Sequence, residues 1–83
     1  MQLKLTWRVE GRSDMDLLVS DDQTISETMQ ILEEKGLLAR KTAETVKYIK
    51  TLRADHQTNV LLTYNEADIY SGDILVLKSP ADK

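Results

Sequence analysis

The stretch TYNEADIYSGDILVL, residues 63–77, carries most of the information about the fold. Thr63 and Glu66 have the spacing of a capping box, which predicts a single helical turn through Asp68. Gly72 follows Ser71 and predicts a tight turn, because glycine adopts positive φ without a steric penalty. The apolar run that comes next predicts a last strand over Ile74–Lys78. The chain thus ends in a helical turn, a tight turn and a strand.

A hairpin is predicted at the other end of the sequence. Apolar and polar residues alternate with the period of a half-buried strand, first at Leu3, Leu5, Trp7 and Val9 and again at Met15, Leu17 and Val19. The polar segment between these runs contains Gly11, as a hairpin turn requires. Leu18 falls on the opposite face of the second strand, where we expect it to be exposed. Trp7 belongs to the apolar face, which favours a core position over a ligand platform.

A helix is predicted over residues 25–35. Thr24 and Glu27 form a capping box at its start, and Gly36 has the place of a left-handed residue after its end. An apolar stripe at helical spacing would face the core, made of Ile25, Thr28, Met29, Ile31 and Leu32.

Residues 46–54 are ambiguous between strand and helix. β-branched and aromatic residues favour a short strand. Val46, Ile49 and Leu52 nevertheless lie three apart, and Thr42 has a position that would cap a second helix. We favour the strand. A brief further strand is expected at Val60–Leu62, after a polar turn that includes His56.

Composition excludes several classes of function. The 83 residues carry a formal net charge of −3 without a clustered basic face, so we expect no nucleic-acid partner. No run approaches the roughly 20 apolar residues of a membrane span, and no secretory signal is visible, so we expect a cytoplasmic protein without direct membrane insertion. With no Cys, one His and no serine in a G-x-S-x-G context, we expect no metal, no cofactor and no catalytic site.

The order of predicted elements resembles the ubiquitin-like β-grasp, an α+β fold with a mixed four- to five-stranded sheet packed on one helix. Residues 1–78 would form a single domain and residues 79–83 a short flexible tail. The pattern I-x-x-G-D-x-L-x-L at Ile69–Leu77 is similar to the YukD/EsaB family of type VII (WXG100) secretion systems in Gram-positive bacteria. The segment Leu37–Thr45 and the length of the tail have no counterpart in that family.

The resemblance implies a non-catalytic protein-interaction module, a cytoplasmic accessory or regulatory component of the membrane-embedded secretion machinery. Its open sheet face would be the docking surface. If Ile74 and Val76 face the helix, Leu75 and Leu77 lie on the open face, and Ile49 joins them if Tyr48 points inward. Leu18 would extend this apolar surface. Alternatively, a homodimer forms there, or residues 37–45 cover it.

Basic residues near the third predicted strand have two interpretations. Lys47, Lys50 and Arg53 form a basic edge for a partner, or they protect an edge strand against unwanted pairing, and we favour protection.

Two other classes of function are alternatives for such a domain. A sulfur carrier or modifier needs a C-terminal Gly-Gly, which the tail lacks. A small ubiquitin-like regulatory subunit of a multicomponent enzyme stays open as the alternative.

Overall fold

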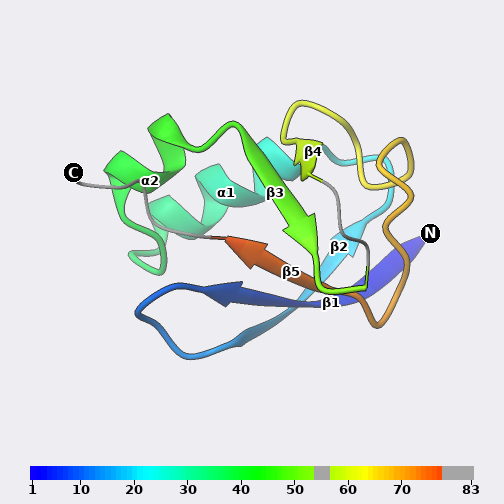
Figure 1. Cartoon of the computed structure of the whole chain (residues 1–83), viewed down its shortest axis with the longest axis horizontal. Coiled ribbons are helices and arrows are strands. Elements are labelled where there is room, and N and C mark those ends of the chain that lie inside the picture. Colours follow the sequence, from blue (N-terminus) through cyan, green and yellow to red (C-terminus); the bar gives the residue numbers. More distant parts are fainter. Residues whose placement is uncertain (54–56, 78–83) are drawn as a thin grey trace.

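Five strands form one mixed sheet in the order β2-β1-β5-β3-β4 (Figure 1). The computed structural model describes residues 1–53 and 57–77, and places the strands at β1 Gln2–Val9, β2 Met15–Ser20, β3 Tyr48–Thr51, β4 Gln57–Asn59 and β5 Ile74–Leu77. β1 pairs antiparallel with β2 and parallel with β5, while β3 pairs antiparallel with both β5 and β4. The hairpin and the last strand are therefore confirmed, and β5 lies in the middle of the sheet.

The helix α1, Ile25–Glu34, packs across one face of this sheet (Figure 1). Its capping box is present: the Glu27 N–H donates to Thr24 Oγ1 at 3.1 Å, and the Thr24 N–H donates to Glu27 Oε1 at 2.9 Å. Gly36 follows with a φ of +76°. The residues that α1 buries are spaced three and four apart, as the sequence predicts, namely Ile25, Thr28, Met29 and Leu32, whereas Ile31 is exposed.

The core lies between α1 and the sheet. Leu3, Leu5, Trp7 and Val9 alternate with more exposed residues along β1 and are all buried. Trp7 is fully buried, which confirms its place in the core. The remaining buried apolar side chains are Val19, Ile25, Met29, Leu32, Leu38, Ile49, Val60, Tyr64, Ile69, Leu75 and Leu77.

A second helix, α2 (Arg40–Thr45), was not predicted in this position. It lacks a side-chain cap, since its N-cap residue is Ala39. Leu38 and Thr42 are buried, and Ala43 and Val46 pack against the core. This segment therefore closes the helical side of the core and does not cover the open face. The strand at residues 48–51 confirms the favoured reading of the ambiguous region.

The short fourth strand lies earlier than predicted. It occupies Gln57–Asn59, whereas the sequence predicted Val60–Leu62. Val60 is buried from a turn, Leu61 is exposed, and the Leu61 N–H donates to Asn59 Oδ1 at 2.8 Å. The prediction was wrong because, of the three apolar residues Val60–Leu62, Val60 alone packs in the core, whereas Leu61 and Leu62 are exposed.

The segment before β5 follows its predicted local pattern. The Glu66 N–H donates to Thr63 Oγ1 and the Thr63 N–H donates to Glu66 Oε1, each at 3.0 Å, so the second capping box is confirmed. Gly72 has a φ of +95°, and its N–H donates to the Lys4 carbonyl at 2.8 Å. The turn is thereby held against β1.

Some predictions fall outside the described residues, namely those for His56, Lys78 and the tail 79–83. The extent of the domain, residues 1–78, stays a prediction. In the described part of the chain, no helix is long and apolar enough to cross a membrane.

Candidate protein-docking face

The predicted assignment of sheet faces is wrong. Leu75, Leu77 and Ile49 are 0%, 1% and 2% exposed, so all three face α1 instead of solvent. Leu75 is the register partner of fully buried Trp7, which fixes the orientation of β5 relative to the core. Because side chains alternate between faces, an error of one residue in this phase exchanges every inward and outward position. Without partial unfolding, these three side chains cannot contact a partner.

A different apolar group lies on the open face. Val76 is the register partner of both Arg8 and Lys50, and Ile74 is the partner of Thr6, so these residues share the face that points away from α1. Tyr48 lies two residues before Lys50, on the same face, and is 53% exposed. Ile74 and Val76 are half-buried. We call Tyr48, Ile74 and Val76 the open-face patch.

The open-face patch has a basic rim. Arg8 and Lys50 flank Val76 in the neighbouring strands, and Lys47 immediately precedes β3 and is exposed. Lys47, Tyr48, Lys50 and Val76 also line a hollow of about 410 Å³ on the surface. An apolar floor with cations around it suits an apolar protein surface that carries carboxylates.

Leu18 is exposed as predicted, at 63%, but it does not join the open-face patch. Its register partner is Lys4 in β1. The polar outward residues of β1, namely Lys4, Thr6 and Arg8, lie between β2 and β5. The structure therefore separates Leu18 from the patch that it was expected to extend.

Arg53 takes part in a structural ion pair. Its guanidinium binds the Asp73 carboxylate and also donates from Nη2 to the Asp68 carbonyl at 3.1 Å. This pairing, foremost its hydrogen bonds, lowers the pKa of Asp73. Edge protection by β3 was also a wrong interpretation, because β3 lies between β5 and β4 and is no edge strand.

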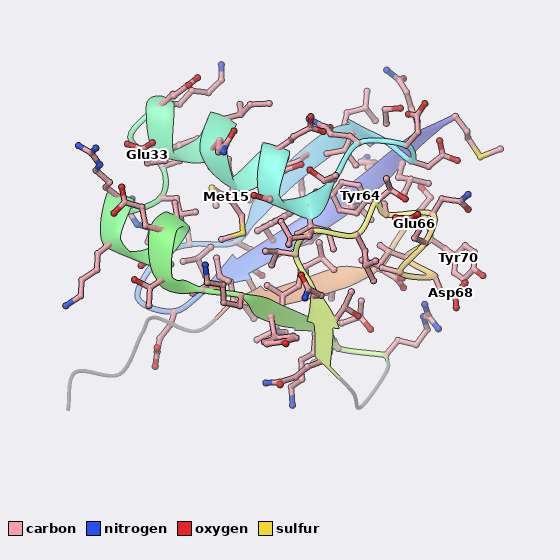
Figure 2. The ribbon with its side chains drawn as sticks, turned by 90° about the horizontal axis from the view of Figure 1, so that it is seen from above. Met15, Glu33, Tyr64, Glu66, Asp68 and Tyr70 are labelled. Carbon is pink, nitrogen blue, oxygen red and sulfur yellow. The ribbon has the colours of Figure 1, made fainter. Side chains whose placement is uncertain are left out.

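Two buried polar side chains, Tyr64 and Thr28, form a structural pair. The Tyr64 hydroxyl donates to Thr28 Oγ1 at 2.6 Å, and the Tyr64 ring lies beside the start of α1 (Figure 2). Burial raises the pKa of Tyr64 to about 12, against smaller lowering effects of Thr28 and Trp7. The Trp7 indole N–H is buried and has no hydrogen-bond partner within the described residues. The hydrogen bond of the neutral, buried Tyr64 phenol therefore connects α1 to the segment that precedes β5.

The described ranges, 1–53 and 57–77, contain no group of three or more His, Cys, Asp or Glu side chains placed to hold a metal ion.

The sequence held a signal for the correct face. Lys50 must reach water, and a residue two positions away in a strand shares its face, so Tyr48 points outward and Ile49 inward. For β5 the sequence alone gives no such marker, because Ile74–Leu77 is apolar throughout.

Comparison with solved structures identifies the fold. No protein-family model and no curated protein matches the chain. The ubiquitin of Caldiarchaeum subterraneum is similar with a TM-score of 0.73 at 15% identity, covering 99% of this chain and 98% of that one.

Two further structures have the same architecture. The C-terminal ubiquitin-like domain of mouse tubulin-specific chaperone e has a TM-score of 0.71 at 12% identity, with 99% of this chain and 90% of that chain covered. A chain of the toluene 4-monooxygenase HD complex has a TM-score of 0.69 at 8% identity, with 95% and 99% covered. The strand order, the capped helix and these structural matches agree: the chain has the ubiquitin-like β-grasp fold.

Proposed function

We propose that this chain is a non-catalytic protein-interaction module that docks a partner protein through the open-face patch. The observation that carries the proposal is the apolar character of this face: Tyr48, Ile74 and Val76 remain accessible although the opposite face already supplies a filled core. Contiguous apolar surface with a polar rim marks interaction sites. Structural similarity to ubiquitin-like domains supports the same class of function.

The rim defines the chemistry of the partner. Lys47 and Lys50 border the patch, and Arg8 borders it as part of an exposed ion pair with Asp14, so the expected partner presents apolar side chains flanked by Asp or Glu. Charge steering of this kind raises the association rate at low salt and weakens as ionic strength increases.

The proposed cellular role is that of a cytoplasmic accessory or regulatory component of a type VII (WXG100) secretion system. Its support is the resemblance of Ile69–Leu77 to the YukD/EsaB family. Leu75 and Leu77, the two leucines of this pattern, are buried, so the pattern reflects the turn and strand of the fold. The residues of β5 available for docking are those that alternate with them, Ile74 and Val76.

Affinity capture from extract of the source cell tests the proposal. Tagged wild-type protein is compared with Tyr48→Ala and Val76→Asp, and captured proteins are identified by mass spectrometry. Tyr70→Ala is the matched control, because Tyr70 is a similarly exposed tyrosine outside the sheet (Figure 2). Secretion-machinery subunits that are captured by wild type and Tyr70→Ala, and lost with both patch variants, would support the proposal. Capture that is insensitive to the patch variants would overturn it.

A small regulatory subunit of a multicomponent enzyme is the second candidate. The match to a chain of the toluene 4-monooxygenase complex, 99% of which is covered, favours it. In the same experiment, recovery of oxygenase or other enzyme subunits in place of secretion components would decide for this alternative.

A further inference from the structure

The two edges of the sheet are protected unequally. β4 is three residues long and offers little backbone to an added strand. β2 is six residues long, runs in continuous register with β1, and contains no Lys, Pro or Gly. Edge strands of soluble proteins are usually short, bulged or charged to prevent pairing with other chains. β2 carries one outward charge, at Asp16, and next to it the exposed Leu18.

The backbone groups at the outer edge of β2 can be assigned from the pairing with β1. The Asp21 N–H donates to the Met1 carbonyl at 2.9 Å, so Asp21 directs its peptide groups toward β1. In an antiparallel pair this direction alternates along the strand. Asp16, Leu18 and Ser20 therefore direct theirs outward, and among the described residues no strand pairs with that edge. Of these outward backbone groups, the Ser20 carbonyl is engaged within the described part of the chain, by the Gln23 N–H at 3.1 Å.

An apolar groove runs beside this edge. It lies between β2 and α1, has a volume of about 130 Å³, and is lined mainly by Leu17, Leu18, Val19, Ile31, Leu32 and Leu37. Ile31 and Leu37 are exposed and form its outer wall. A strand added to β2 would place alternate side chains in this groove and the others beside Leu18 on the open side.

The ends of the edge are acidic. Asp16 accepts from the Thr6 hydroxyl at 2.7 Å, and Asp22 accepts from the Ser20 hydroxyl, which lowers the pKa of Asp22. Neither carboxylate has a cationic partner within the described residues. Asp16 lies within β2 and Asp22 lies two residues past its end, so at most about 20 Å of extended chain separates them. Among the described residues that line the groove, Lys35 is the one cation.

We propose that β2 and the groove beside it form a second docking site, which takes an extended apolar peptide segment with Lys or Arg about six positions apart. Backbone pairing with Leu18 and its outward neighbours provides the affinity, and the groove and the two aspartates provide the specificity. A second copy of this chain fits worse. Antiparallel pairing of two β2 strands about Leu18 sets Ser20 of the second copy opposite Asp16, and Asp14, which is already held by Arg8, opposite Asp22, so neither carboxylate meets a cation.

Titration of isotope-labelled full-length chain with the peptide KTVIVTK, followed by amide chemical shifts, tests this proposal. The expected result is saturable shifts centred on Asp16, Leu18 and Ser20, with smaller ones at Ile31 and Leu37. The peptide KTPIPTK lacks two strand N–H donors and should bind at least about tenfold more weakly. The peptide ETVIVTE should also bind more weakly, by a margin that shrinks in high salt.

Two variants separate this site from the open-face patch. Ile31→Lys changes an exposed groove residue and should weaken KTVIVTK binding, whereas Tyr48→Ala should leave it unchanged. Equal binding of KTVIVTK and KTPIPTK, or shifts confined to the open-face patch, would overturn the proposal. A dimer in sedimentation that KTVIVTK fails to dissociate would overturn it in favour of a second copy.

Discussion

Arg53 and Asp73 form a two-pronged ion pair, in which Nε and Nη2 of the guanidinium donate to the two carboxylate oxygens, each at 2.9 Å. The carboxylate is buried and also accepts from the Tyr70 N–H at 2.9 Å, while the guanidinium lies over the Tyr70 ring, 5.5 Å from its centre. Arg53 follows β3 and Asp73 precedes β5. The pair therefore stabilises the turn that leads into β5, the central strand of the sheet.

Replacing Asp73 with Ala should destabilise the protein by roughly 1–3 kcal/mol, because the Tyr70 N–H, in a part-buried hydrogen bond, and the Arg53 guanidinium lose their acceptor together. Urea unfolding followed by the fluorescence of Trp7, the single Trp, measures this change. Asp14→Ala is the matched control. The Asp14 pair with Arg8 is exposed on both sides, so its loss should cost less than about 1 kcal/mol. Equal losses for the two variants would contradict a structural role for Asp73.

Acid should remove the contribution of Asp73. Its pKa in the folded state is lowered, first by the Arg53 hydrogen bonds, whereas an unfolded aspartate titrates near pH 3.9. A lowered folded-state pKa stabilises above the unfolded value and ceases to do so as pH falls through the folded value. The difference in unfolding free energy between wild type and Asp73→Asn should therefore be constant from neutral pH down to about 4 and shrink below it. A difference that is unchanged at pH 2 would contradict this account.

The orientation of β5 can be measured with two neighbouring truncations. Leu75→Ala removes a fully buried side chain and should cost about 2–5 kcal/mol. Ile74→Ala truncates a half-buried side chain on the open face and should cost clearly less. Ile is the stronger strand former of the two, so a smaller total cost at position 74 reflects its lower burial and not a smaller loss of β propensity. If Ile74→Ala proved the more damaging, the face assignment of the structure would be reversed.

Local patterns in the sequence were sufficient for much of the fold. Thr24 with Glu27 marked the start of α1, and Thr63 with Glu66 marked a hydrogen-bonded turn, because the residues that satisfy each other are three positions apart. The alternation of apolar and polar residues around Trp7 likewise predicted β1 from neighbouring residues alone. α2 was not predicted because its N-cap, Ala39, supplies no side-chain hydrogen bond. β4 was not predicted at Gln57–Asn59 because these residues are polar.

The candidate site was predicted less well, because faces are set by pairing between distant segments. Nothing within Ile74–Leu77 distinguishes inside from outside, and only the alignment of Leu75 with Trp7 settles it. Leu18 and Lys47 could be placed correctly as exposed, since polar neighbours or local alternation identify them. Ile49 was assigned to the wrong face although Lys50 next to it carried the answer.

The buried hydroxyl of Tyr64 should contribute measurably to stability. Tyr64→Phe leaves Thr28 Oγ1 without its 2.6 Å hydrogen bond and should cost about 1 kcal/mol. Thermal or urea unfolding at neutral pH measures the loss. Tyr70→Phe is the control. The Tyr70 ring is exposed, so the loss of its hydroxyl should leave the free energy of unfolding nearly unchanged. No loss with Tyr64→Phe would show that the pairing with Thr28 adds nothing beyond packing.

Alkaline conditions should weaken wild type more than Tyr64→Phe. Burial raises the pKa of Tyr64 to about 12, whereas an unfolded tyrosine titrates near pH 10. A raised folded-state pKa means that the native state holds its proton longer, so the contribution is fully present below about pH 10 and is lost as pH rises toward 12. Unfolding free energies from pH 9 to 12 should fall more steeply for wild type, by about 2–3 kcal/mol over this range. Parallel curves for the two proteins would mean that the phenol ionises without resistance from the fold.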